Sequence, residues 1–283
     1  MTRTALWSAG VAILAIGIGA CTPAGPPPPR TGTPAYYWLS AMETWQAGQY
    51  EKCLEHLEKI LRGGDPIVAK AAPLRLLILA GLARGYEDMS DQFQLGAESI
   101  KSGSTASHRR RADQYRAQAA NFALQLGDAY AQFEQASPSG PVTFDFPFPT
   151  RGVLVPPAVF TRVGQGQLIP DMEIDRLLAA MLQRGVLREV TAAVGAAGDT
   201  AKAQAAMAKL PLEAGRGPFL AALGESLYEV SKIFGPRGRG ETPRQEHLLN
   251  LASKALAGAS GDSLKELKAK VEKDLKSAAA RKK

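Results

Sequence analysis

The stretch from Ile67 to Gly85 is apolar on every side of the helix that it would form, and no other part of the chain restricts the fold as strongly. A helix that spans a membrane needs about 20 apolar residues, and this stretch is shorter. A helix of this length that is apolar all round has to be buried between neighbouring helices. The sequence therefore predicts a central helix that the rest of the chain encloses.

Most of the remaining chain has the apolar spacing of amphipathic helices. In its first half we expect further helices near 35–47, 50–62, 90–101 and 104–135, of which the first two end at glycines. The helix at 104–135 carries one continuous apolar stripe, suited to packing or to helix pairing. The stripe consists of Tyr115, Ala119, Phe122, Leu126, Tyr130 and Phe133.

The chain is predicted to be helical again from Asp171, which is a candidate N-cap after a proline. Another amphipathic helix is expected near 218–234. The segment Thr242-Pro243-Arg244-Gln245 has the form of a capping box with proline at the first helical position. The last helix, from about Ser263, carries lysine and glutamate on most faces and is expected to lie on the surface.

Residues 137–170 interrupt this pattern with seven prolines and four of the nine phenylalanines of the chain. Phe144, Phe146 and Phe148 alternate with other residues, so one edge of an extended chain is apolar, and the prolines between them exclude a central strand. Either this long connection wraps on the helical body and buries its Phe edge, or it docks on a partner. We favour wrapping, because exposed phenylalanines promote aggregation.

The first 20 residues have the layout of a secretory signal, in which Arg3 precedes a short apolar core that ends in small residues. The segment Ile18-Gly19-Ala20-Cys21 then resembles the bacterial lipobox. The resemblance implies that the chain is cut before Cys21 and that this cysteine carries the lipid that anchors the protein outside the cytoplasm. The absence of Asp at position 22 favours the periplasmic face of the outer membrane. An ordinary secretory signal is the alternative.

Residues 21–34 form a proline-rich tether between this anchor and the helices. The run from Pro26 to Pro29 favours polyproline II at about 3.1 Å per residue, so the tether could hold the body up to roughly 40 Å from the bilayer. Two or more acyl chains on Cys21 would hold the protein stably at a membrane, whereas one chain holds only weakly.

Residues 36–61 resemble a tetratricopeptide repeat, and a weaker second copy surrounds Ala80-Gly81. The resemblance covers about 65 residues at 35–100 and implies stacked helical hairpins that bind peptides or proteins. The chain lacks a clean period of about 34 residues. The number of repeats is therefore open, and an ordinary helical hairpin is the alternative. The matching residues are Gly48-Gln49-Tyr50 at the turn, Ala41 and Cys53 at small positions, and Leu57 at an aromatic position.

Charge and cysteine content exclude several classes of protein. The chain is mildly basic, with 34 Lys and Arg against 27 Asp and Glu, which suits solubility or an anionic lipid or glycan surface. It has no nucleic-acid-binding motif, so nucleic acid is not an expected partner. If Cys21 is lipidated, Cys53 has no intramolecular partner, and we expect it to be a buried, inert thiol.

The chain has no familiar catalytic or metal-binding pattern, and we expect no catalytic residue, cofactor or metal ion. The segment Gly224-Glu225-Ser226-Leu227 lacks the trailing glycine of a nucleophile elbow. The three histidines lie far apart, in no ligand spacing, and are each expected on a helix surface. They are His56, His108 and His247.

One dense cluster of positive charge lies at Arg109-Arg110-Arg111, with Arg116 about a turn beyond. Three adjacent arginines on a helix span too wide an arc to be buried together, so a solvated face is the simpler interpretation. The functional interpretation is a patch of these four arginines that binds a lipid headgroup, a glycan or an acidic partner.

These observations predict an all-α, α-solenoid-like protein. We expect tetratricopeptide-like hairpins at 35–136, the non-helical connection at 137–170 and a second helical region at 171–283, after the signal peptide at 1–20 and the tether at 21–34. The expected function is that of a lipid-anchored scaffold or adaptor that binds one or more envelope proteins. The alternatives are a solute- or lipid-binding lipoprotein that serves a transporter, and an enzyme with an unfamiliar site.

Overall fold

The computed structural model describes residues 28–137, 139–149, 157–236, 238–259 and 264–281, and in these residues the fold is all-α. Cys21 and the expected signal peptide lie outside the described residues. The elements in chain order are α1 (Pro34–Gln46), α2 (Tyr50–Leu61), α3 (Val68–Ser99), α4 (Ala106–Ala136), β1 (Val142–Phe144), α5 (Pro157–Gly164), α6 (Asp171–Ala193), α7 (Thr200–Ala206), β2 (Leu212–Ala214), α8 (Arg216–Ser231), the 3-10 helix η1 (Lys232–Phe234), α9 (Thr242–Ala257) and α10 (Leu264–Ala280).

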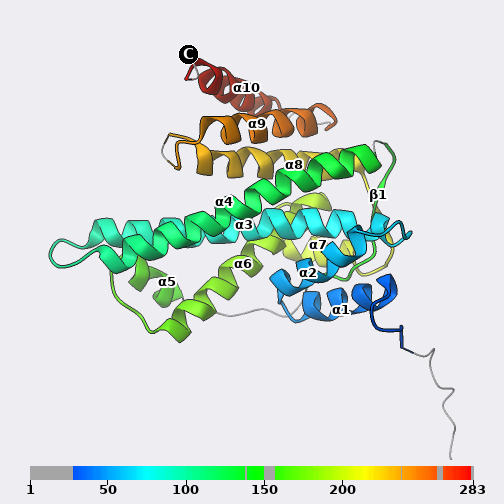
Figure 1. Cartoon of the computed structure of the whole chain (residues 1–283), viewed down its shortest axis with the longest axis horizontal. Coiled ribbons are helices and arrows are strands. Elements are labelled where there is room, and N and C mark those ends of the chain that lie inside the picture. The colour runs from blue at the N-terminus through cyan, green and yellow to red at the C-terminus, as the bar shows by residue number, and fades with distance from the viewer. Residues whose placement is uncertain (1–27, 138, 150–156, 237, 260–263, 282–283) are drawn as a thin grey trace, which may run out of the picture.

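Helix α3 is the centre of the molecule. It contacts α2, α4, α5, α6 and α8, and in Figure 1 the stack of α8, α9 and α10 lies above it while α1, α2, α5 and α6 lie below. Its apolar side chains between Leu74 and Leu82 are almost completely buried. The prediction of an enclosed central helix is confirmed.

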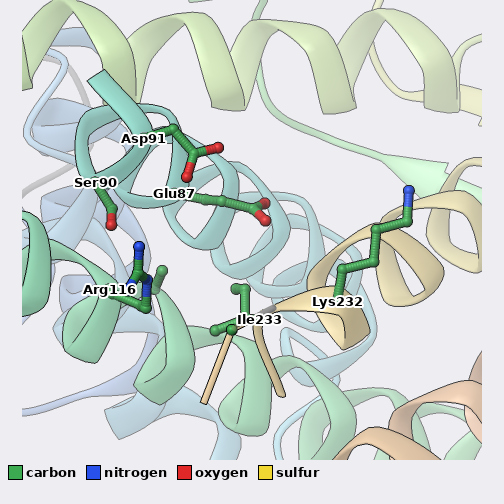
Figure 2. Close-up of a pocket in the computed structure, with 8 residues that line it drawn as sticks. Glu87, Ser90, Asp91, Arg116, Lys232 and Ile233 are labelled. Atoms are coloured by element: carbon green, nitrogen blue, oxygen red, sulfur yellow. The ribbon is translucent and has the colours of Figure 1, made fainter. Parts of the chain in front are cut away.

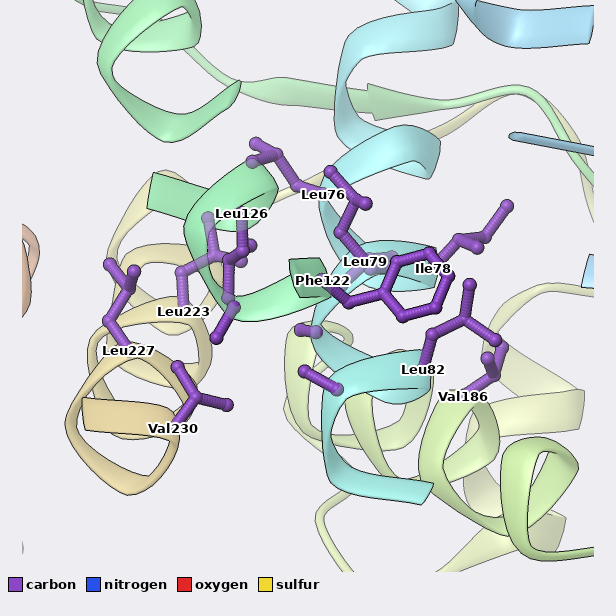
Figure 3. Close-up of a cluster of buried hydrophobic side chains, with 14 of the residues drawn as sticks. Leu76, Ile78, Leu79, Leu82, Phe122, Leu126, Val186, Leu223, Leu227 and Val230 are labelled. Atoms are coloured by element: carbon purple, nitrogen blue, oxygen red, sulfur yellow. The ribbon is translucent and has the colours of Figure 1, made fainter. Parts of the chain in front are cut away.

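The two helical regions of the sequence share one core. Figure 3 shows Leu79 of α3 and Phe122 of α4 packed with Val186 of α6, while Leu223 and Leu227 of α8 close the other side of the cluster. Helices from both sides of the proline-rich connection thus bury their apolar faces against each other. A side chain removed from this cluster would leave a cavity that helices from both regions line.

The predicted break between helices at 67–85 and 90–101 is wrong, because α3 continues through it as one helix of 32 residues. A glycine inside a helix costs about 1 kcal/mol relative to alanine, which packing can offset. The second repeat copy around Gly81 therefore has no turn. The first hairpin, α1–α2, does turn at Gly48, whose φ is 72°. Whether that hairpin is a true tetratricopeptide repeat stays a prediction.

Small residues let α3 and α6 cross at very close range. A Cβ on Gly81 would lie 2.5 Å from Cα of Val186, and one on Gly85 would lie 2.8 Å from Cα of Leu182. On the α6 side, a Cβ on Gly185 would collide with the carbonyl oxygen of Gly81. The backbones of the two helices therefore touch at this crossing, and any side chain there would force them apart.

Where the structure describes it, the connection at 137–170 packs on the helical body. Phe144 and Phe146 are fully buried and Phe148 is 6 % exposed. The Phe146 ring lies edge-on to Trp45, 5.5 Å between centroids, and the Trp45 indole N–H donates to the carbonyl of Pro147 at 2.7 Å. Aromatic packing and one hydrogen bond thus fasten this segment to the α1–α2 hairpin.

The prediction that this connection is non-helical is wrong, because it contains the helix α5. Its strand β1 pairs antiparallel with β2, with Val142 opposite Ala214 and Phe144 opposite Leu212. Helix α5 follows at Pro157, because proline is well tolerated at the first position of a helix, where its missing N–H is not needed. Helix α5 packs against α3.

Two predicted helix starts differ in detail. Helix α6 begins at Asp171 itself, so Pro170 occupies the cap position. Helix α9 begins at Thr242 with Glu241 at the cap, and no side chain makes the capping hydrogen bond. The carboxylate of Glu241 instead binds Arg239 and Arg244. The predicted capping box is therefore not formed.

Candidate functional site

The four arginines do not form one patch. Arg109 and Arg110 are exposed, whereas Arg111 binds the carboxylate of Asp171 at 2.7 Å and lies over the ring of Phe93. Arg116 is on another side of α4, 3.8 Å from Asp113. Successive residues of a helix point about 100° apart, so a run of arginines is spread around the helix.

Arg116 instead lines a polar hollow between α3, α4 and η1 (Figure 2). The hollow has a volume of about 190 Å³, and Glu87 and Asp91 enter it from α3. Lys232 stands on the opposite side, beyond Ile233. Both signs of charge therefore face one small space.

Glu87 is the group in this hollow whose charge is least compensated. Burial raises its pKa to about 7, although Arg84 opposes the shift. The nearby cation Lys232 is already bound to Glu229 at 2.8 Å. The hydroxyl of Ser90 donates to the carbonyl of Ala112 at 2.9 Å and is not free to act as a nucleophile. The hollow thus combines carboxyl groups with cationic side chains, and none of the residues that line it is an activated nucleophile.

A second buried carboxyl lies between α6 and α8. The hydroxyl of Ser226 donates to Glu189, which is 3 % exposed and whose pKa burial raises to about 7. Ser226 lies inside α8 and not on a strand-to-helix turn, where the serine of a nucleophile elbow lies. Sequence reasoning missed Glu189. Its position beside Val186 and Val190 was the available signal that it faces the core.

The histidines and Cys53 have different environments. His247 is exposed and His56 is half-buried, stacked on Tyr37, but His108 is only 1 % exposed, so its predicted surface position is wrong. Within the described ranges no three His, Cys, Asp or Glu residues are arranged to hold a metal ion. Cys53 is fully buried, and burial raises its pKa to about 12. The predicted buried thiol is confirmed.

Helix α1 is apolar but packed on one side. It lies against α2, and only its Ala41 and Trp45 are buried. Leu39 is 45 % exposed, and Tyr36 and Met42 are half-buried on either side of it. These three residues, here called the α1 outer face, lie along one side of α1, and Met42 at its edge also packs partly against the core. Tyr and Met are enriched at the cores of protein interfaces.

No family model, curated protein sequence or solved structure matches this chain. In the part of the chain that the structure describes, no helix has the length and apolarity needed to cross a membrane.

Proposed function

We propose that this protein is a lipid-anchored scaffold of the cell envelope that binds a partner protein through the α1 outer face. The observation that carries the proposal is the 45 % exposure of Leu39 between Tyr36 and Met42, on a helix that buries only two residues. Contiguous apolar side chains on the surface of an edge helix are a common mark of a protein-interaction site.

A partner helix fits this surface best. Helices α1, α2, α3 and α4 pack in sequence as antiparallel neighbours, so a helix laid on α1 would continue the same stacking. The surface also lies directly after the tether, because α1 begins at Pro34 and Thr33 accepts a hydrogen bond from the Tyr36 N–H at 3.3 Å. A lipid on Cys21 would thus keep the α1 outer face near the membrane, and we expect the partner at the same membrane surface.

Four hollows of the described residues are each smaller than a typical small-molecule pocket. Those lined by Glu87, His108, Glu189 and Ser253 have volumes of about 190, 60, 240 and 220 Å³. A pocket that encloses a small-molecule ligand typically has roughly 300 Å³ or more.

Site-specific photo-crosslinking in native envelopes tests the partner surface. A benzophenone side chain at position 39 should give one adduct of constant mass, and the same probe at position 210 should not. Leu210 is a matched control, since it is 38 % exposed but lies far along the chain, between α7 and β2. Leu39→Asp should abolish co-purification of that partner while Leu210→Asp retains it. Equal yields at both positions would contradict the proposal.

The anchor is tested separately by Cys21→Ala. This change should abolish labelling by palmitate and move the protein from the membrane to the soluble fraction, because two or more acyl chains supply the stable attachment. Labelling that persists in the variant would exclude Cys21 as the lipidated residue.

A further inference from the structure

His108 is buried without a hydrogen-bond partner. It is 1 % exposed, and neither Nδ1 nor Nε2 makes a hydrogen bond within the described part of the chain. More than about nine in ten buried polar groups in proteins are hydrogen-bonded, and each exception calls for an explanation. Burial lowers the pKa of His108, although the backbone of Gln167 favours its protonated form. The ring thus interacts with the backbone of Gln167, but neither of its nitrogens makes a hydrogen bond of full geometry.

The imidazole lines a hollow of about 60 Å³ between the start of α4 and the segment before α6. One water molecule needs at least about 10–15 Å³, so there is room for a small polyatomic group. Ser107, Arg110 and Arg111 line the same hollow from α4, and Gln167 and Leu168 line it from the other side. Arg110 is exposed and forms no ion pair with any described residue.

The start of α4 adds a favourable field for an anion. The helix has 31 residues, no acidic residue in its first turn, and no side-chain hydrogen bond from Thr105 at the cap position. The N-terminus of a helix carries a partial positive charge and free N–H groups that bind anions. The first turn of the helix, two guanidinium groups, a hydroxyl and an imidazole therefore face this small space, and the apolar side chains of Phe93, Ile169 and Ile174 line the rest of it.

We propose that this hollow binds a phosphate group, with Arg110 and Arg111 supplying charge and Ser107 and His108 supplying hydrogen bonds. Guanidinium groups match the oxygen geometry of phosphate and bind it through charge-assisted hydrogen bonds. The site is separate from the α1 outer face and does not depend on the proposed scaffold function. The proposed site contains two of the four arginines in the cluster, Arg110 and Arg111.

The phosphate could be free or could belong to a lipid headgroup. Leu168, which lines the hollow, is 75 % exposed, and Met172, in the first turn of α6, is 62 % exposed. An acyl chain attached to a bound phosphate could cover these two side chains. Free phosphate would leave them exposed, so the two sources predict different affinities.

Asp171 competes with the phosphate. Its carboxylate binds Arg111 at 2.7 Å while its own side chain is 85 % exposed. A bound phosphate must share or replace that ion pair. The variant Asp171→Asn keeps the shape of the side chain but frees the guanidinium, so it should bind phosphate more tightly.

Calorimetric titration of the purified full-length protein in a neutral detergent tests the site, with inorganic phosphate and dihexanoylphosphatidic acid as the two probes. Arg110→Gln and His108→Phe should each weaken binding about tenfold, the loss expected of one charge-assisted hydrogen bond. Arg109→Gln is the matched control, since Arg109 is the neighbouring exposed arginine and does not line the hollow. It should bind as the unmodified protein does.

A second readout separates binding from folding. His108→Phe preserves a ring against Phe93, whose centroid is 5.7 Å away, and removes two unpaired nitrogens. Its thermal stability without phosphate should therefore equal or exceed that of the unmodified protein while its phosphate affinity falls.

Binding of phosphatidic acid at least tenfold tighter than inorganic phosphate would assign a lipid headgroup, and equal affinities would assign free phosphate.

Two kinds of result would overturn the proposal. One is that neither probe binds the unmodified protein, or that Arg110→Gln and His108→Phe bind both probes unchanged. The other is that Arg109→Gln weakens binding as much as Arg110→Gln, because that would indicate a diffuse positive surface in place of a built site.

Discussion

The substitution Gly81→Ala should destabilise the protein through the close crossing of α3 and α6. The added Cβ would lie 2.5 Å from Cα and 2.6 Å from N of Val186. Carbon atoms in contact are optimally about 3.5–4.0 Å apart, so the two helices would have to separate by roughly 1 Å. Both neighbouring atoms belong to a backbone and cannot turn away as a side chain can.

The magnitude follows from two opposing effects. Overpacking a buried site costs about 1–3 kcal/mol, and we take the upper end because backbone meets backbone. Replacing glycine by alanine inside a helix stabilises the folded state by about 1 kcal/mol, because alanine has the higher helix propensity. The net loss in free energy of unfolding should be about 2 kcal/mol. For a chain of this size that lowers the Tm by roughly 4–8 °C.

Thermal unfolding followed by circular dichroism measures this loss, and Gly127→Ala is the matched control. Gly127 is also a buried glycine in a long helix, but its Cβ would meet side-chain ends and no backbone: Leu248 at 3.0 Å, Leu251 at 3.2 Å and His247 at 3.7 Å. That variant should stay within about 1 kcal/mol of the unmodified protein. Equal stabilities of the two variants would refute the backbone contact between α3 and α6.

Three further predictions use single variants. Phe146→Ala should cost about 3–5 kcal/mol in thermal unfolding, because it empties a fully buried site against Trp45; a loss under about 1 kcal/mol would contradict the wrapped connection. The folded pKa of Glu189 is about 7 against an ordinary 4.5, so the folded state holds this proton more tightly and stability should fall as pH rises from about 4.5 to about 7. Glu189→Gln should flatten that decline in denaturant titrations across this range, and Glu266→Gln, which changes an exposed carboxylate on α10, should not; an unchanged slope in the first variant would count against a protonated Glu189. In the Cys21→Ala protein, Cys53 should react with a thiol reagent only after denaturation, since burial raises its pKa to about 12; rapid reaction of the native protein would show that the thiol is accessible.

Local sequence signals predicted the helices well and their ends less well. The apolar run at Leu74–Leu82 correctly indicated the buried centre, because a surface apolar on all sides has only one favourable place in a folded chain. Gly85 was misread as the end of that helix. Its close contact with Leu182 of α6 offsets its poor helix propensity, and the residues nearby in sequence do not show that contact.

The candidate sites were predicted less completely than the fold. The sequence alone identified the arginines of α4. It did not show that Arg110 is exposed, that Arg111 is paired or that Arg116 lines a polar hollow, because each environment depends on the helices beside that residue. The sequence around His108 did not indicate that this residue is buried. Its environment comes from Phe93 and from residues near Gln167, which are far from it along the chain.

The all-α class, the enclosed helix and the apolar edge of the connection could be predicted from the sequence. Apolar periodicity and proline positions are local signals, which depend only on residues a few positions apart. The tertiary structure decided that α3 is continuous, that Phe146 lies against Trp45, and that Glu189 and Ser226 pair inside the body. Each of these outcomes depends on contacts between residues distant in sequence. These contacts contribute free energy only after the helices have packed, and so the local spacing of residues does not indicate them.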